Sequence, residues 1–418
     1  MHHFVYKDTD LYCEDLSVAY IADQIGTPFY LYSYSTIKRH FQVFNNAFSS
    51  LDHLTCFSLK SNSNLAILRL LALEGGGADI VSGGELFRAL RAGITPDKIV
   101  YSGVGKTPKD IELALKSEIL MFNVESDQEL RALNRIAKDI GGKAVIAIRI
   151  NPDLELKTHP YITTGSGENK FGIQIKNSLK TYALAKRLKN IDVKGISCHI
   201  GSQLTEIGPF VEALKKLKGL LRELNGMGLD IKFLNFGGGL GITYNDEKPP
   251  HPLEYARALK EIIGEEKFTL ILEPGRVIIG NAGILVTRVL YTKSTATKRF
   301  IIVDAGMNDL IRPALYNSFH TVQPVKMTRS KMITATLAGP ICETGDFLAK
   351  DRKMPSFKSG DLVAIMSAGA YGFSMASNYN SRPRPAEVMV KGKLSSIIRQ
   401  RETYDDLISR EEIPKFLG

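Results

Sequence analysis

The feature of this sequence that most constrains its fold is a regular alternation of short apolar runs and amphipathic stretches. Eight runs rich in Val, Ile, Leu and Phe cover residues 55–60, 78–82, 99–102, 119–124, 144–150, 195–200, 232–236 and 269–272. The stretches between them carry apolar residues at helical three-and-four spacing, as in 65–73, 84–92, 108–116 and 126–140. This alternation predicts a parallel sheet, and eight repeats is the number that closes an α/β TIM barrel. An open doubly wound sheet stays an alternative, because a count of strands does not prove closure.

The chain after residue 280 has a different pattern, in which apolar residues alternate with polar ones between turn residues. Candidate strands cover residues 283–290, 299–304, 331–338, 361–367 and 386–391. We therefore predict a mostly antiparallel C-terminal β domain over residues 280–418 and a barrel over residues 33–279. The N-terminal segment, residues 1–32, is expected to pack with the β domain. A length of 418 residues fits two domains.

Composition favours a soluble globular protein, since 44% of the residues are hydrophobic and 23% are charged. The four cysteines, Cys13, Cys56, Cys198 and Cys342, show no CxxC spacing, so neither a disulfide framework nor a metal site is expected. Neither a signal-peptide pattern nor a membrane-spanning apolar run is found in the sequence, and a cytoplasmic location is predicted. The net charge of +10 is scattered among acids, which makes nucleic-acid binding the least favoured function.

Four polar segments directly follow apolar runs, which is where the active site of a TIM barrel lies. They are Lys60 within Phe57-Ser58-Leu59-Lys60-Ser61-Asn62, the segment 199–203 that begins with His199, the glycine-rich loop 237–241, and Glu273-Pro274-Gly275-Arg276. An amine, an aromatic base, a phosphate-binding loop and a carboxylate-arginine pair suit an aldehyde cofactor that carries a phosphate and a pyridine ring. Pyridoxal 5'-phosphate is the predicted cofactor.

Each of these segments also has a purely structural interpretation. Lys60 could be a solvated lysine, and the serines and asparagines after it resemble a helix N-cap. The glycine loop could be a flexible turn, although three consecutive glycines after a strand favour a phosphate site. His199 could be a core histidine rather than a ring that stacks on the cofactor. Glu273 could pair with Arg276 rather than hold the pyridine nitrogen, and Arg276 could bind a substrate carboxylate.

Other polar segments are less specific. Residues 103–107 resemble half of a P-loop, but Val100 stands where the first glycine is required, so a nucleoside triphosphatase is not favoured. Polar turns at residues 304–306, 312–316, 339–346 and 369–372 could be turn chemistry alone. They could also converge on a ligand held between the two domains.

From about Tyr12 to Tyr404 the chain closely resembles the diaminopimelate decarboxylases, which belong to the alanine-racemase-like, fold-type III class of pyridoxal-phosphate enzymes. The most specific stretches are residues 78–85, 199–203, 237–241, 273–276, 342–346 and 369–372. The resemblance implies decarboxylation of meso-2,6-diaminopimelate to L-lysine and CO2, the last step of lysine biosynthesis. The sequence departs from the usual Tyr-Ala-x-Lys-Ala-Asn at residues 57–62, where the lysine and asparagine are kept but Ser58 and Ser61 change the local hydrogen bonding.

The resemblance also implies a role for individual residues. Lys60 would bond to the cofactor aldehyde, His199 would lie against the ring, and Glu273 would face the pyridine nitrogen. Further cofactor contacts would come from Asp79, Ser82, Ser202, Gly238, Gly239, Pro274, Gly275, Arg276 and Tyr371. Substrate contacts would come from Arg276, Arg312, Tyr316, Glu343 and Tyr371. Cys342 would help to return a proton to the substrate carbon, acting from the neighbouring subunit of a head-to-tail homodimer.

Other functions stay open at this point. A related decarboxylase could act on ornithine, arginine, D-lysine or a carboxylated polyamine, and a racemase would need a second acid-base group on the opposite face. A protein that only binds pyridoxal phosphate is a non-enzymatic alternative. It would have no need of a second domain that carries Cys342, Glu343 and Tyr371.

Overall fold

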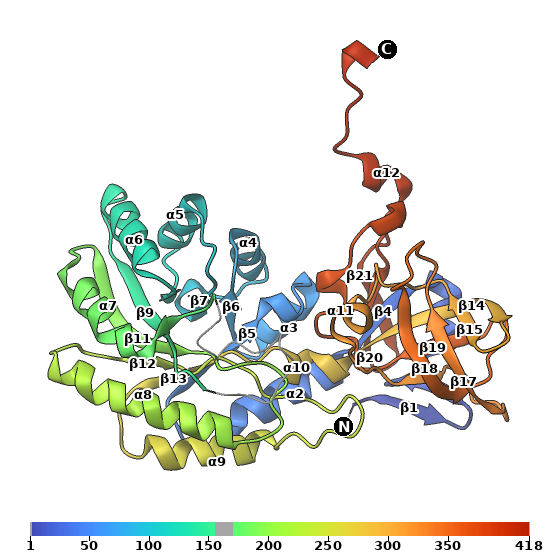
Figure 1. Cartoon of the computed structure of the whole chain (residues 1–418), viewed down its shortest axis with the longest axis horizontal. Coiled ribbons are helices and arrows are strands. Elements are labelled where there is room, and N and C mark those ends of the chain that lie inside the picture. The colour runs from blue at the N-terminus through green and yellow to red at the C-terminus, as the bar shows by residue number, and fades with distance from the viewer. Residues whose placement is uncertain (1, 155–169, 418) are drawn as a thin grey trace. The chain divides into compact units, whose positions relative to one another are not determined.

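The computed structural model of the chain describes residues 2–154 and 170–417 (Figure 1). It divides into two compact units. One, which we call the barrel unit, is Lys38–Ile278. The other, which we call the β unit, combines Met1–Ile37 with Ile279–Gly418.

The barrel unit contains a closed, parallel barrel of eight strands. These are β5 (His53–Ser58), β6 (Gly77–Ile80), β7 (Ile99–Tyr101), β8 (Met121–Val124), β9 (Ala144–Asn151), β11 (Ile191–Cys198), β12 (Phe233–Asn235) and β13 (Thr269–Leu272). The order runs β9-β11-β12-β13-β5-β6-β7-β8, and a pairing of β8 with β9 closes the ring. The predicted TIM barrel is confirmed, and the open sheet is wrong. An additional two-residue strand, β10 (Ile173–Gln174), pairs with β9 and was not predicted.

Helices surround this barrel and alternate with its strands (Figure 1). They are α2 (Tyr34–Ala47), α3 (Leu65–Leu73), α4 (Gly83–Arg91), α5 (Pro108–Lys116), α6 (Asp127–Asp139), α7 (Ile175–Arg187), α8 (Gly208–Gly226), α9 (Pro252–Ile263) and the short α10 (Arg276–Ile279). Several begin at a side-chain cap, as the sequence favours: Ser126 caps α6, and Thr107 forms a capping box with Asp110 at the start of α5. These two caps fix the residues at which the loops after β7 and β8 end.

The β unit is built on a mostly antiparallel nine-stranded sheet. Its main path is β18-β17-β15-β14-β4-β20-β21, and β16 and β19 extend it from β14. The strands are β4 (Phe29–Ser33), β14 (Gly283–Ser294), β15 (Arg299–Val303), β16 (Val322–Pro324), β17 (Met332–Ala338), β18 (Phe347–Pro355), β19 (Leu362–Ile365), β20 (Ala386–Lys391) and β21 (Leu394–Arg399). The N-terminal strand β4 lies between β14 and β20, so residues far apart in the sequence share one sheet.

A small sheet and three short helices complete the β unit. The sheet contains β1 (Phe4–Lys7), β2 (Asp10–Cys13) and β3 (Leu16–Ser17), and the helices are α1 (Val18–Ile25), α11 (Arg312–Tyr316) and α12 (Tyr404–Ile408). The small sheet and α1 pack on the large sheet through an apolar core that includes Leu11, Ile21, Phe29, Ile284 and Val388. Burial of this core fixes the N-terminal residues to the C-terminal part of the chain.

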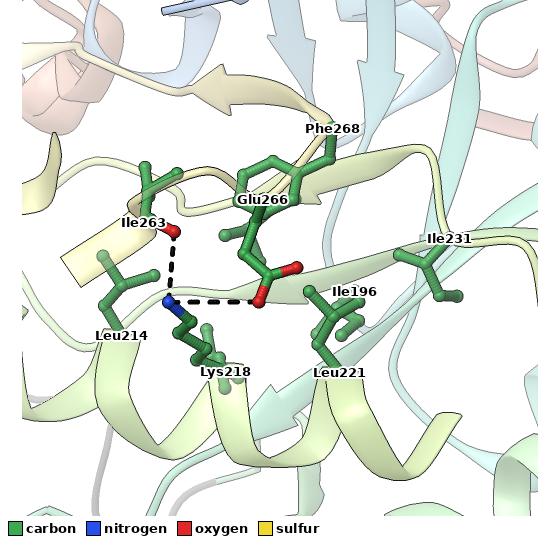
Figure 2. Close-up of a pocket in the computed structure, with 10 residues that line it drawn as sticks. Ile196, Leu214, Lys218, Leu221, Ile231, Ile263, Glu266 and Phe268 are labelled. Atoms are coloured by element: carbon green, nitrogen blue, oxygen red, sulfur yellow. Dashed lines mark hydrogen bonds and ion pairs between the residues drawn. The ribbon is translucent and has the colours of Figure 1, made fainter. Parts of the chain in front are cut away.

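Figure 2 shows an apolar pocket that lies between α8 and the inner strands of the barrel unit. Its walls include Ile196, Leu214, Leu221 and Phe268. At its edge Lys218 Nζ donates a hydrogen bond of 3.1 Å to the carbonyl of Ile263 and lies 3.9 Å from Glu266 Oε1. Of the described residues that line it, none is a predicted site residue, so we interpret it as a helix-sheet packing gap.

No helix in the described part of the chain is both long and apolar enough to cross a membrane.

Candidate active site

Lys60 lies beside a buried carboxylate at the end of the first barrel strand. It is in a single 3-10 turn, Leu59–Ser61, that directly follows β5. Its Nζ is 3.7 Å from Oδ2 of Asp79, whose strand β6 pairs in parallel with β5. The Asp79 side chain is completely buried, whereas that of Lys60 is 38% exposed. The lysine therefore presents an accessible amine next to a fixed negative charge.

Glu273 follows β13 and accepts hydrogen bonds from three donors that come from β12, from β8 and from the residue after β7. Its Oε1 accepts hydrogen bonds from Asn235 Nδ2 at 2.6 Å, Asn123 Nδ2 at 3.2 Å and Ser102 Oγ at 3.4 Å. Burial above all, and then the nearby Asp79 carboxylate, raises the pKa of Glu273 to about 7. A carboxyl group that titrates near neutrality can share a proton with a pyridine nitrogen.

The salt-bridge alternative for Glu273 does not describe the structure. The ion pairs among the described residues do not include one between Glu273 and Arg276. Glu273 is bound instead by the neutral donors given above, and Arg276 has its own partners.

His199 directly follows β11 and faces the glycine loop. Its Nδ1 accepts a hydrogen bond of 3.2 Å from the backbone N–H of Gly238. Burial, together with the positive charges of Lys60 and Arg149, lowers the pKa of His199 well below its ordinary value. The ring is therefore neutral, with Nδ1 as the acceptor, and this state suits stacking on another aromatic ring.

The glycine loop packs backbone against backbone with its two neighbours. A Cβ atom on Gly238 would lie 2.2 Å from the carbonyl oxygen of Glu273, and one on Gly239 would lie 2.4 Å from that of Gly201. Gly239 also has a φ of +117°, which other residues rarely adopt. A backbone bond of 2.7 Å from Glu273 N–H to the Gly237 carbonyl ties the loop to the end of β13. Only glycine permits this close approach of one backbone to another.

Arg276 is fixed by two hydroxyl groups. Its Nη1 donates to Tyr244 Oη at 2.6 Å and its Nη2 donates to Ser202 Oγ at 3.0 Å. These two bonds orient the guanidinium. Arg276 thus lies at the same barrel end as the glycine loop. Its guanidinium is suited to bind a phosphate or a carboxylate.

In the β unit, Arg312 is bound to a buried histidine that the sequence analysis did not identify. Arg312 Nη1 lies 2.9 Å from His320 Nε2, and His320 Nδ1 lies 2.9 Å from the carbonyl oxygen of Met366. Because a carbonyl only accepts, Nδ1 carries the proton and Nε2 accepts from Arg312. His320 thereby fixes the orientation of the arginine.

The remaining predicted residues of the β unit lie on turns. Cys342 and Glu343 are exposed on a turn held by the buried Asp346, whose oxygens accept the backbone N–H groups of Met307 at 2.6 Å and Ile341 at 2.7 Å. Tyr371 has a φ of +56°, an uncommon conformation for a large residue. Tyr316 is at the end of α11 and is partly buried.

Some polar side chains have clear structural partners. Ser82 Oγ accepts the backbone N–H of Glu85 at 3.2 Å and so caps α4, and its role toward a cofactor stays a prediction. Lys106, in the segment that resembles half of a P-loop, is buried and bound to Glu129 Oε1 at 2.8 Å. Arg149 Nη1 is bound to Glu125 Oε1 at 2.6 Å.

Sequence reasoning missed several members of the cluster at the barrel end. They are Ser102, Asn123, Asn235 and Tyr244, together with Ser58, which donates to Asp79 Oδ2 at 2.5 Å. Ser102, Asn123 and Asn235 are polar residues at the ends of apolar strands, so the rule that found Lys60 and Glu273 also applies to them. Tyr244 lies in a loop and carries no such signal.

The barrel end fits pyridoxal phosphate. Lys60 offers an amine to the aldehyde, and Glu273 offers a carboxyl group to the pyridine nitrogen. The glycine loop that follows β12 is the kind of segment whose backbone N–H groups can bind a phosphate. Oδ1 of Asp79 is buried and has no hydrogen-bond partner among the described residues, as expected of a group that faces a polar ligand. The donor set thus matches each end of the cofactor.

Comparisons with known proteins agree with this match. The sequence model of the family described as "Pyridoxal-dependent decarboxylase, pyridoxal binding domain" matches residues 34–280. The chain is 51% identical over 404 residues to "Diaminopimelate decarboxylase" of Aquifex aeolicus, with 96% of each chain covered. It is 49% identical to the protein of the same name from Pseudomonas aeruginosa, with 99% of each covered.

Solved structures with the same architecture include relatives that hold L-lysine. The diaminopimelate decarboxylase of Helicobacter pylori complexed with L-lysine is 44% identical and has a TM-score of 0.91, with 94% of this chain and 98% of that chain covered. The enzyme from M. jannaschii in co-complex with L-lysine is 38% identical with a TM-score of 0.95, and 100% of both chains is covered. Fold and site together define a pyridoxal-dependent decarboxylase of the barrel type. Within that class, the chain belongs to the diaminopimelate decarboxylase family.

Proposed function

We infer that this chain is an enzyme that decarboxylates meso-2,6-diaminopimelate to L-lysine and CO2 with pyridoxal 5'-phosphate as its cofactor. This reaction is the last step of lysine biosynthesis. The observation that carries the inference is the meeting of Lys60, Glu273 and the glycine loop at one barrel end, in a chain 51% identical over 404 residues to a diaminopimelate decarboxylase.

When bound, the cofactor supplies an electron sink for the pair of electrons left on the substrate α-carbon as CO2 departs. We propose that the Nζ of Lys60 would hold the cofactor through its aldehyde. Glu273, with its pKa raised to about 7, holds a proton at the pyridine nitrogen. The neutral ring of His199 lies against the cofactor ring and keeps water from that face.

The phosphate would be held by the backbone around Gly238 and Gly239, by Ser202 and by the guanidinium of Arg276. Support comes from the close packing of the glycine loop and from the hydrogen bond of 3.0 Å between Arg276 and Ser202. A guanidinium oriented in this way is suited to bind a dianionic phosphate. Asp79, Ser82, Pro274, Gly275 and Tyr371 complete the proposed set of cofactor contacts.

Recognition of the distal end of the substrate is assigned to the β unit. We propose that Arg312 binds the distal carboxylate, while Glu343 binds the distal ammonium and Tyr316 and Tyr371 make further contacts. Arg312 is 6% exposed and is oriented by His320, so little side-chain entropy is lost when it binds a carboxylate. A substrate that lacks the distal carboxylate, such as ornithine, would leave this arginine without its ligand.

We also propose that the protein works as a cytoplasmic homodimer in which Cys342 of one subunit returns a proton to the substrate carbon in the site of the other. The exposed position of Cys342 on a turn supports this role. Mixing inactive Lys60→Ala and Cys342→Ala dimers under conditions of subunit exchange tests it. Sites shared between subunits predict recovery of about a quarter of the wild-type activity, because half of the random dimers regain one intact site. No recovery after verified exchange would place Cys342 in the site of its own subunit.

The function itself is tested by product analysis. Wild-type protein loaded with pyridoxal phosphate is incubated with meso-diaminopimelate, and CO2 and L-lysine are measured beside a Lys60→Ala control. We expect the two products in equal amounts from the wild type and neither from the variant. Release of CO2 from ornithine, arginine or D-lysine but not from diaminopimelate would overturn the substrate. A D-amino acid without CO2 would indicate racemisation.

A further inference from the structure

Ser58, the last residue of β5, makes a hydrogen bond to Asp79 in the neighbouring strand β6. Its hydroxyl donates to Asp79 Oδ2 at 2.5 Å. Ser58 and Asp79 are directly paired where β5 and β6 run side by side. Ser58 is 2% exposed and Asp79 is fully buried. A short hydrogen bond to a carboxylate in a dry environment is among the strong ones.

The same carboxylate oxygen is the one nearest to Lys60. Lys60 Nζ lies 3.7 Å from Asp79 Oδ2, which is longer than a hydrogen bond between an ammonium and a carboxylate. Ser58 thus occupies the oxygen that Lys60 would otherwise approach. The two side chains come from positions 58 and 60 of one strand end and compete for one acceptor.

We propose that Ser58 is a positioning residue that holds Asp79 through its hydroxyl, so that the Lys60 ammonium is not drawn into a direct hydrogen bond with that carboxylate. A lysine that pairs directly with a buried carboxylate keeps its proton to higher pH. Only the neutral amine adds to an aldehyde. Ser58 therefore makes Lys60 more reactive toward the cofactor at neutral pH, and this inference rests on the proposed role of Lys60.

Other charged groups act on Lys60 but are the same with or without the Ser58 hydroxyl. The charge of Lys60 interacts electrostatically with three groups and lowers their pKa values. They are Glu85 in α4, His199 after β11 and Glu273 after β13. Arg149 in β9 also acts on His199 and Glu273. A comparison of Ser58→Ala with the wild type isolates the hydroxyl against this constant background.

Ser61 provides a matched control. Its hydroxyl is as buried as that of Ser58, but it donates to the backbone carbonyl of Ser58 at 2.7 Å rather than to Asp79. Removal of either hydroxyl deletes one oxygen atom, at the end of β5 for Ser58 and in the turn that follows for Ser61. Only the removal at residue 58 should change the partner of Asp79.

The test measures the pH at which Lys60 becomes reactive in the full-length protein stripped of cofactor. Acylation of Lys60 by acetic anhydride is followed by peptide mass spectrometry from pH 7 to 11, with folding verified by circular dichroism. For Ser58→Ala we expect the midpoint to rise by about one pH unit, which is about tenfold slower acylation at pH 8. Ser61→Ala should match the wild type. In an Asp79→Asn background, Ser58→Ala should cause no further shift, because the hydroxyl acts through the carboxylate.

Three outcomes would overturn the proposal: no shift in Ser58→Ala, a shift to lower pH, or the same shift in the Asp79→Asn background. None of them depends on whether Lys60 binds the cofactor. That role is examined separately by loading the wild type and Lys60→Ala with pyridoxal phosphate and following the absorbance of the bound cofactor. Failure of the proposed function and failure of the Ser58 proposal are therefore distinguishable.

Discussion

The polar cluster at the barrel end and the polar turns of the β unit are built in opposite ways. In the barrel, Asp79, Asn123 and Asn235 belong to strands, and each is at most 1% exposed. In the β unit, Cys342 and Glu343 are exposed on a turn. Strand residues cannot shift without breaking the sheet, so the barrel cluster suits a cofactor that must be held in one place. Turn residues tolerate change, and they suit the reading of a particular substrate.

The largest change that we expect is in the pH dependence of stability, and it tests whether Glu273 is shielded from water. In the cofactor-free protein the pKa of Glu273 is raised from 4.5 to about 7, so the folded state favours its protonated form. Ionisation of the buried Glu273 therefore lowers the free energy of unfolding. This loss is absent below pH 4.5, grows as the pH rises to about 7, and stays at about 3 kcal/mol above that pH. Urea unfolding of the wild type and Glu273→Gln at pH 5 and pH 8 checks this.

We expect Glu273→Gln to remove most of that pH-dependent loss and to be the more stable protein at pH 8, because glutamine has no charge to bury and its Oε1 still accepts from Asn235. An equal loss of stability between pH 5 and pH 8 in both proteins would mean that Glu273 is well solvated. The barrel cluster would then differ little from the exposed turns.

The next effect concerns the β unit. Arg312→Ala should raise the KM for meso-diaminopimelate by about 100-fold, since it removes the proposed charge-assisted contact to the distal carboxylate. Steady-state kinetics measure the change, and the affinity for pyridoxal phosphate in the same variant is the control. A KM equal to that of the wild type would remove Arg312 from substrate recognition. A loss of affinity for pyridoxal phosphate would mean that the β unit also contributes to cofactor binding.

The smallest effect is the response of two glycines to one added methyl group. A Cβ on Gly238 would meet the Glu273 carbonyl oxygen at 2.2 Å, so Gly238→Ala should destabilise the protein by about 2 kcal/mol and weaken cofactor binding. Gly219 in α8 has no atom within 4 Å of its Cβ position, so Gly219→Ala should stabilise by about 0.5–1 kcal/mol. Thermal unfolding measures both changes. Equal effects of the two substitutions would contradict the close packing of the loop.

Most of the barrel was predictable because its strands are buried on both faces and read as apolar runs. The two-residue β10 was too short to give such a signal. In the β unit, β18 was missed because its centre reads Lys350-Asp351-Arg352-Lys353, and charges of this kind are typical of an edge strand. Its position at the end of the sheet explains the charges, but the sequence alone does not reveal that position.

The candidate site also has residues that the sequence predicts and contacts that it does not predict. Lys60, His199 and Glu273 were predictable from their places after apolar runs. The bond from Ser58 to Asp79 depends on the register of β5 against β6, and that of Arg312 with His320 depends on how α11 packs. Register and packing are tertiary properties, so these positioning contacts required the structure.

Chemical trapping tests whether Lys60, at the end of β5, holds the cofactor. The protein loaded with pyridoxal phosphate is reduced with borohydride, which fixes the cofactor to the lysine that binds it, and is then digested and mapped by mass spectrometry. We expect a single pyridoxyl-phosphate adduct on Lys60. An adduct on another lysine, or none in a protein that retains the cofactor, would contradict it.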